Sequence, residues 1–539
     1  MTLSRRRLLQ AAAALPAVTG CATAARPAAT FEANWDSLIA GYRTPDWFRD
    51  AKLGIWSHWG PQCVPEFGDW YGRLMYVQGS PFHEHHLKTY GHPSQVGFME
   101  IMNLWKAAAW DPEDLLDLYQ AAGARYVMSM ANHHDNLDMF DSPHPWNSLR
   151  VGPKRDIVGT WERAVRARGL RFGVSNHAAH AWHWWQTAYG YDAEGPRAGQ
   201  RYDAYRLTKA DGKGRWWEGL DPQELYTGPS FVPPDSLTSI AAMNAWHEAR
   251  DGQWLETVPP RNPAFVASWA RRQKALVDRY RPDMVYFDNY GLPLERHGLE
   301  ATAYYYNASQ AWRGELPVVN GKKLGPDQRR GIVETVERGF SEDLKPEPWQ
   351  TDTCIGDWHY NRSRFTGHSY VPAAAVIQRL CDVVAKNGNL LLSIPQRGDG
   401  SIDADERAIL RDMAAWVAVN GEAIFASRPW RRYGEGPTQV AAGMQNEGGA
   451  RPWTAQDIRF TTRGGALYAI ALDWPADGRL SIRSLGLTAL EGRRVEAVRL
   501  LGAGAVSFIQ TDEALTVTLP ETRPVAFVPA LKVLGPHLA

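Results

Sequence analysis

A predicted amphipathic helix, followed by a short apolar strand that ends in polar residues, recurs through most of this chain. In one instance Asp111 is the predicted N-cap, Pro112 occupies the first helical position, and Gly123 ends the helix. The apolar strand at residues 126–130 then leads into the polar sequence 132–135. Because strands that alternate with helices pair in parallel through helical crossovers, this pattern predicts an α/β fold.

Eight apolar segments of this kind are predicted strands: residues 53–57, 126–130, 171–175, 284–287, 318–320, 332–336, 350–354 and 389–393. Together they favour a (β/α)8-like barrel over residues 31–423. A doubly wound sheet would show the same alternation, but neither G-x-G-x-x-G nor a Walker loop follows the first strand. Over residues 424–539 the helical period disappears, and the strand formers and glycine-rich turns there predict a C-terminal antiparallel β-sandwich for support or sugar binding.

The composition agrees with two folded domains and excludes some partners. The 539 residues exceed the usual limit of a single core, about 250–300 residues. Lys and Arg total 59, as do Asp and Glu, so no net charge favours nucleic acid. The four cysteines have no C-x-x-C spacing and give neither a disulfide framework nor a zinc signature.

Residues 1–30 are predicted to be a targeting signal. Arginines at positions 5–7 precede an apolar run, as in twin-arginine signals. Residues 18–21 resemble a lipobox, which would make Cys21 a lipid-anchored first residue; cleavage near residues 22–24 would leave a soluble periplasmic protein instead. The run is shorter than the roughly 20 residues of a membrane span. We therefore expect export to the periplasm or a lipid anchor at the cell envelope, and the oligomeric state stays open.

Residues capable of catalysis gather at, or just past, the carboxyl ends of predicted strands: His58, His133, His134, Asp288, Glu337 and Arg338. In (β/α)8 barrels this rim carries the active site. Asp288 follows four apolar residues, where a carboxylate is costly unless its charge is used; an N-cap of the next helix is the alternative. Arg338 could hold hydroxyls or orient a carboxylate, or could pair with Glu334 or Glu337.

Two groups of histidines invite a metal interpretation. Adjacent strand residues point to opposite faces, so His133 and His134 are not expected to chelate one ion together. Hydrogen bonds to sugar hydroxyls are favoured over a structural role or a metal site for this pair. The sequence His-Glu-His-His at residues 83–86 is interpreted as a solvated loop.

These residues, with their neighbours, resemble the motifs of the α-L-fucosidases of glycoside hydrolase family 29. The similarity is carried by residues 47–60 (with His-Trp-Gly), 68–71, 123–135, 282–288, 387–392 and 433–437. It extends from about residue 47 to residue 474. The chain departs from the family pattern at Asp69, where Glu is expected, and at Asn132, Asn136 and Leu137.

Carried over residue by residue, the resemblance implies that Asp288 is the nucleophile of a retaining hydrolase that releases fucose from fucosylated glycans. The implied substrate-binding residues are His58, Asp69, Trp70, His133 and His134, with Arg338 close to the sugar. The family also implies a catalytic barrel, a C-terminal sandwich, no metal and no cofactor.

The second carboxyl group is less clear from the sequence. A retaining hydrolase needs one about 5–5.5 Å from the nucleophile, to act first as acid and then as base. Many relatives have Trp-Glu where this chain has Trp349-Gln350, and an amide cannot titrate. Asp352 would face the same side of that strand, and Glu337 ends the preceding strand. We favour Glu337, whose side chain is longer, and keep Asp352 as the alternative.

Two other functions stay open at this stage. The histidines could serve a metal-dependent hydrolase, which a chelator would inactivate. The chain could also be a catalytically silent carbohydrate-binding lipoprotein, with Gln350 and Asn132 as signs of lost activity.

Overall fold

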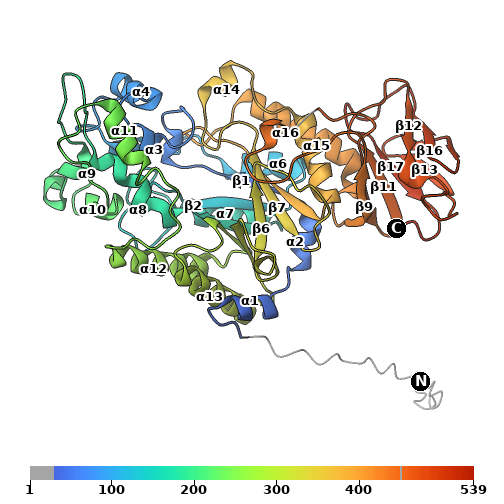
Figure 1. The fold of residues 1–539 in the computed structure, drawn as a ribbon, viewed down its shortest axis with the longest axis horizontal. Helices are drawn as coiled ribbons and strands as arrows, with labels where there is room; N and C mark the ends of the chain where they lie inside the picture. The colour runs from blue at the N-terminus through green and yellow to red at the C-terminus, as the bar shows by residue number, and fades with distance from the viewer. Residues whose placement is uncertain (1–29, 450–451) are drawn as a thin grey trace, which may run out of the picture.

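The computed structural model describes residues 30–449 and 452–539, and it confirms the predicted architecture (Figure 1). A closed parallel barrel is followed by two antiparallel sheets. The predicted signal and Cys21 lie outside the described residues. Within those two ranges, no helix combines the length and the apolar character that crossing a bilayer requires.

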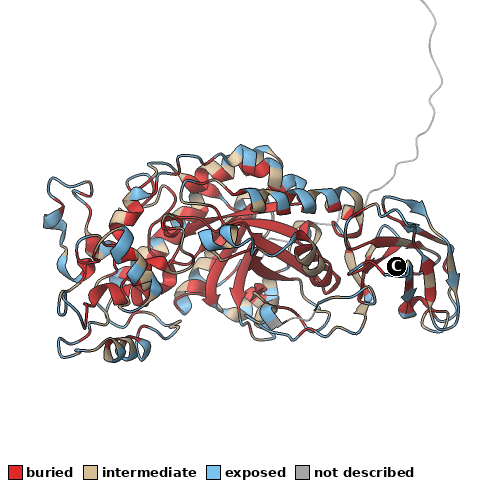
Figure 2. Cartoon of the chain, turned by 90° about the horizontal axis from the view of Figure 1, so that it is seen from above, coloured by how far each residue is buried: buried red, intermediate tan, exposed pale blue. Residues whose placement is uncertain are grey.

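The barrel strands follow chain order, and each falls on one predicted segment. They are β1 (Leu53–Ser57), β2 (Tyr126–Asn132), β3 (Arg171–Asn176), β4 (Met284–Tyr290), β5 (Val318–Lys322), β6 (Val333–Glu337), β7 (Trp349–Cys354) and β8 (Gly388–Ser393). The barrel closes because β1 pairs in parallel with both β2 and β8: Ile55 lies opposite Val127 on one side and Leu392 on the other. The strands are almost entirely buried (Figure 2), as expected of a barrel filled with side chains and covered by helices.

The helices that accompany the barrel include the four that the sequence predicts. These four are α6 (Pro112–Ala121), α7 (Ile157–Ala167), α12 (Pro263–Tyr280) and α15 (Ala373–Ala385); the others are α1 (Trp35–Gly41), α2 (Asp46–Ala51), α5 (Phe98–Leu104), α13 (Arg296–Arg313), α14 (Arg362–Thr366) and α16 (Ala404–Asn420). The Asp111 carboxylate caps α6 by accepting from the backbone N–H groups of Glu113 and Asp114. Asn262 caps α12 in the same way, which confirms these two helix starts.

The connection from β3 to β4 is much longer than a simple crossover. It contains the short helices α8 (Ala181–Trp184), α9 (Asp203–Arg206), α10 (Pro222–Leu225) and α11 (Ile240–Glu248). These helices lie with α3 (Tyr71–Leu74) and α4 (Pro81–Thr89) in one lobe, at the left of the barrel in Figure 1. No pattern in the sequence predicted the structure of this stretch, which ends where α12 begins and which we call the β3–β4 insertion (residues 177–262).

The histidine-rich segment 83–86 lies in α4, so the prediction of a solvated loop is wrong. Ser80 accepts a hydrogen bond from the His83 backbone N–H and Pro81 begins the helix, a start signal that the sequence contains. His83 and His86 are buried, and a ring nitrogen of each lies within 2.8 Å of a backbone carbonyl. Both histidines therefore hold the lobe together.

The C-terminal part forms two antiparallel sheets at the opposite end of the molecule from the lobe (Figure 1). The larger sheet contains β14 (Gly504–Ala505), β13 (Ala497–Leu500), β17 (Ala530–Leu534), β11 (Ala466–Ala471), β10 (Ile458–Arg463) and β9 (Arg428–Glu435); the smaller contains β12 (Arg479–Ile482), β16 (Leu515–Thr518) and β15 (Phe508–Gln510). The connection between β9 and β10 returns to the barrel, where the Gln445 backbone N–H donates to the Glu337 carbonyl at 2.9 Å.

Candidate active site

A cavity of about 500 Å³ opens where the carboxyl ends of the barrel strands meet. Of the predicted site residues, those that line it are His58, Asp69, Trp70, His133, His134, Asp288, Glu337 and Asp352. The structure adds further lining residues that the sequence analysis did not single out: Trp56, Leu74, His177, Trp254, Tyr286, Tyr290, Lys322, Trp358, His359 and Gln445. Barrel topology therefore brings together groups that are far apart in the sequence.

Asp288 faces the histidines of this cavity from β4. His134 Nε2 lies 3.3 Å and His177 Nδ1 lies 3.4 Å from its Oδ2, and Lys322 Nζ donates to its Oδ1. Burial alone would raise the pKa of Asp288, but the Lys322 ammonium, His177 and the hydrogen bonds from His134 and His177 hold it well below the ordinary range. Asp288 is thus an ionised carboxylate at neutral pH.

Lys322, at the end of β5, connects Asp288, the candidate nucleophile, with Glu337, the favoured candidate for the acid–base group. Its Nζ also donates to Glu337 Oε2, at 2.6 Å. Burial would lower the pKa of Lys322, but Asp288 and Glu337 raise it above its ordinary value, so the side chain carries a positive charge. One oxygen of Asp288 and one oxygen of Glu337 are therefore hydrogen-bonded to the same ammonium group, which keeps the two carboxyl groups close together.

Asp352 is the neighbour of Glu337 in the pairing of β6 with β7, but its surroundings differ. Its Oδ1 accepts from Thr335 Oγ1 at 2.6 Å and its Oδ2 accepts from the Tyr286 hydroxyl at 3.2 Å. The residue is fully buried, and burial together with the charge of Glu337 raises its pKa to about 7. Both oxygens are held by the barrel, whereas the Glu337 side chain is 17% exposed toward the cavity.

His133 and His134 both line the cavity, and the expectation that they would face opposite sides is wrong. β2 ends at Asn132, and its pairing with β3 shifts register between Met130 and Asn132, so the alternation of a regular strand does not apply to the next two residues. The two ring centroids lie only 4.3 Å apart.

The opening of the cavity is lined by aromatic rings. Trp70 adopts a left-handed backbone conformation, with φ at 62°, and its ring stacks on Trp254 at 6.0 Å. Trp254 arrives from the β3–β4 insertion, anchored by Glu256, whose Oε1 accepts from Trp254 Nε1 at 2.9 Å. Glu256 Oε1 also accepts from the backbone N–H of Tyr290, the last residue of β4, at 2.8 Å, so the insertion is tied to the rim of the barrel.

Asp69 and Arg338 have structural partners that the sequence did not reveal. Asp69 lines the cavity, but its carboxylate accepts from the backbone N–H groups of Trp358 and His359. Arg338 lines a neighbouring cavity instead, and its guanidinium donates to Glu447 at 2.6 Å rather than to Glu334 or Glu337.

Gln350 and Asn132 each perform a structural task. Gln350 accepts from the Tyr126 hydroxyl at 2.9 Å inside the barrel, where a Cβ on Gly54 would come within 2.2 Å of the same ring. Asn132 donates to Asp138 and accepts from the backbone N–H groups of His177 and Ala178. Neither residue points to a decayed active site.

Several residues that line the cavity were not predicted from the sequence, and the reason differs from one residue to the next. His177 follows β3 directly, so the rule that selected His58 and His133 would also have found it. Lys322 was missed because the predicted strand ended at Asn320, two residues before β5 does. Trp254 and Gln445 arrive from long connections, and no local signal in the sequence placed them at the rim.

Family models and known proteins that resemble this chain point to one family. A family model described as alpha-L-fucosidase matches residues 19–422, and a model of the alpha-L-fucosidase C-terminal domain matches residues 451–533. Tissue alpha-L-fucosidase of Macaca fascicularis is 27% identical over 513 residues, which cover 94% of this chain and 91% of that protein. The Homo sapiens tissue enzyme is 26% identical over the same length and coverage. A crystal structure of Thermotoga maritima alpha-fucosidase is similar with a TM-score of 0.65 at 25% identity, covering 94% of this chain and all of that one.

Proposed function

Because the chain belongs to the α-L-fucosidase family of glycoside hydrolases, we propose that it hydrolyses α-L-fucosides with retention of configuration. The observation that carries this proposal is the placement of Asp288 and Glu337 on one ammonium group inside a histidine-lined cavity. We assign Asp288 as nucleophile and Glu337 as acid and base. His58, Trp70, His133 and His134 would contact the fucose, in agreement with the family resemblance.

In the first step, the Asp288 carboxylate attacks the anomeric carbon while Glu337 gives its proton to the departing glycosidic oxygen. Asp288 becomes a glycosyl ester and Glu337 becomes a carboxylate. In the second step, Glu337 takes a proton from water, and the hydroxide formed attacks the same carbon from the face that the leaving group left. Two inversions give net retention.

Lys322 suits both states of this cycle. The first step requires Glu337 to hold a proton, so the negative charge then lies on Asp288, and after the step it lies on Glu337; Lys322 Nζ contacts both carboxyl groups. One buried ammonium can therefore balance one carboxylate throughout, without moving. Such a preorganised charge stabilises the transition state because no solvent must reorganise around it.

Lys322→Met is expected to lower kcat/KM by roughly 10²–10³-fold, the usual effect of removing one preorganised charge from an active site. It should also raise the pKa of Asp288, since Lys322 makes the largest contribution that lowers it. Asp288 must be ionised to react, so activity falls as the pH drops through its pKa. The acid limb of the pH–rate profile should therefore move to higher pH, and Lys322→Arg should return it toward the original position. An unchanged acid limb in Lys322→Met would contradict the assigned role.

The function itself is tested with an aryl α-L-fucoside. Release of α-L-fucose as the first anomer seen by NMR, and labelling of Asp288 by a 2-fluoro-fucosyl reagent followed by peptide mapping, are the expected results. A chelator should leave the rate unchanged, which separates this reaction from a metal-dependent hydrolase. No turnover, or a label on another residue, would refute the proposal.

The N-terminal sequence supports a separate proposal, export to the periplasm or the cell envelope, where fucosylated glycans would be the substrate. Its support is the paired arginines before an apolar run and the lipobox that ends at Cys21. Metabolic labelling with a fatty acid, compared between the original protein and Cys21→Ser, would distinguish a lipid anchor from simple cleavage.

A further inference from the structure

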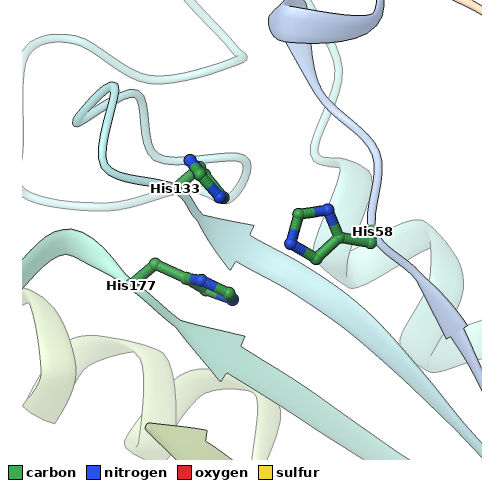
Figure 3. Close-up of side chains that lie close together, drawn as sticks. All are labelled: His58, His133 and His177. Carbon is green, nitrogen blue, oxygen red and sulfur yellow. The ribbon is translucent and has the colours of Figure 1, made fainter. Parts of the chain in front are cut away.

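Three imidazole rings of the cavity lining lie close together, one from just past the end of each of the first three strands (Figure 3). His58 follows β1, His133 follows β2 and His177 follows β3. One ring nitrogen of each lies within 4.8 Å of the others. The ring centroids are 5.2 Å apart for His58 and His133, 5.3 Å for His58 and His177, and 4.9 Å for His133 and His177. We call these residues the triple-histidine cluster.

The cluster has unsatisfied hydrogen-bonding capacity. All three residues are more than nine-tenths buried, and neither His58 Nδ1 nor His177 Nε2 has a hydrogen-bond partner in the described parts of the chain. Buried polar atoms without partners are rare in proteins and call for a ligand. The proposed fucose hydroxyls are one such ligand, but neutral imidazole nitrogens are also good ligands for zinc and copper.

The surroundings of the rings resemble those of built metal ligands. His177 Nδ1 lies at an ion-pair distance of 3.4 Å from Asp288 Oδ2, and neither nitrogen of this ring has a hydrogen-bond partner among the described residues. Gln62 Nε2 lies 2.7 Å from His133 Nδ1. The same amide nitrogen also donates to Asp135 Oδ2 at 3.4 Å, so Gln62 fixes the orientation of the His133 ring.

A second group of potential ligands nearby is less suitable. His134, His180 and Asp288 also bring ligand atoms within 4.8 Å of one another. However, the Lys322 ammonium already occupies Asp288, and Glu256 already pairs with His180. A cation there would have to displace or face the Lys322 charge. Among the described residues, the charged contact of the triple-histidine cluster is instead an anion, the Asp288 carboxylate beside His177.

We propose that the triple-histidine cluster binds a single Zn²⁺ or Cu²⁺ ion, and that this ion is an inhibitor that excludes the sugar from the cavity. A small inward rotation of the rings would give the Zn–N distances of about 2.0–2.1 Å that zinc requires, with water in the fourth position. The ion occupies the place of fucose hydroxyls and takes no part in catalysis. Binding of the ion stands on the cluster alone; the competition with substrate rests on the proposed function.

The test uses the full chain and Zn²⁺ alone as the probe. Isothermal titration of chelator-treated protein should show one Zn²⁺ per chain, and the double variant His58→Ala/His177→Ala should bind it more weakly by roughly 100-fold or more. His368→Ala is the matched control, because His368 is 76% exposed and lies outside the cluster. It should bind like the unmodified protein. Equal binding by the double variant, or no stoichiometric binding, would overturn the proposal.

A second measurement needs no variant and guards against misfolding. L-Fucose should weaken Zn²⁺ binding to the unmodified protein, and Zn²⁺ should raise the KM for an aryl α-L-fucoside while leaving kcat unchanged. If Zn²⁺ binds at the cluster but no fucoside is hydrolysed, the metal site stands and the proposed function fails. If turnover is normal and L-fucose leaves Zn²⁺ binding unaffected, the competitive site is refuted while the function stands.

Discussion

Asp288→Ala is expected to lower kcat/KM for an aryl α-L-fucoside by roughly 10⁴-fold or more, because it removes the atom that forms the covalent intermediate. The expectation rests on the ionised state of Asp288, which Lys322 and the neighbouring histidines maintain. It also rests on position: both carboxylate oxygens are engaged at the cavity by cationic or imidazole groups. The variant should still fold, because Lys322 keeps its ion pair with Glu337 and is not left as an unpaired buried charge.

Azide provides the sharper readout of this variant. It can enter the space of the missing carboxylate and attack the anomeric carbon from the face opposite the leaving group. One inversion then gives β-L-fucosyl azide, which NMR identifies. The matched control is Asp235→Asn, since the exposed Asp235 pairs with Arg201 in the β3–β4 insertion and should keep full activity. Unchanged turnover in Asp288→Ala, or no azide product, would contradict the assignment.

The barrel was predictable because its signals are local. An apolar run of about five residues followed by a polar residue marks the strands, and N-cap signals mark helices such as α6 and α12; such patterns report which face of an element is buried. Asp111 as N-cap of α6 and Leu53–Ser57 as β1 both appear in the structure as the sequence indicates. Topology then follows, since parallel strands joined by helices close in order.

The active site was predictable only in part. His58, His133 and His134 follow the ends of β1 and β2 within two residues, and Asp288 lies two residues before the end of β4, so the strand pattern located them. Trp254 and Gln445 could not be placed, because long connections reach the rim through tertiary contacts such as the hydrogen bond from the Tyr290 backbone N–H to Glu256. The ion-pair partner of Arg338 could not be predicted from the sequence either, because that partner is Glu447, from the C-terminal part of the chain.

The choice between Glu337 and Asp352 is where the structure adds most to the sequence. Glu337 ends β6, and Asp352 is its pairing partner in β7, two residues before that strand ends. The two side chains therefore differ in environment rather than in position. Asp352 accepts from Thr335 and Tyr286 in the barrel interior, whereas Glu337 faces the cavity beside Lys322. A proton donor must reach the glycosidic oxygen, which favours the carboxyl group with the freer side chain.

Glu337→Gln is therefore expected to lower kcat/KM by about 10²–10⁴-fold for fucosides with poor leaving groups, the range for loss of an acid–base group. For an aryl fucoside with a good leaving group, the first step needs little help from an acid, so the fall in kcat/KM should be much smaller. Asp352→Asn mimics the protonated form that burial favours, since its pKa lies at about 7. It should show a modest loss with no dependence on the leaving group.

The stereochemistry of azide rescue separates the two carboxyl groups of the mechanism. In Glu337→Gln the covalent intermediate on Asp288 still forms, and azide needs no base to attack it. The product should be α-L-fucosyl azide, the opposite anomer to that from Asp288→Ala, because two inversions occur instead of one. If Asp352→Asn rather than Glu337→Gln shows the leaving-group dependence and the α-azide product, the proton donor is Asp352, and Lys322 would then balance the nucleophile alone.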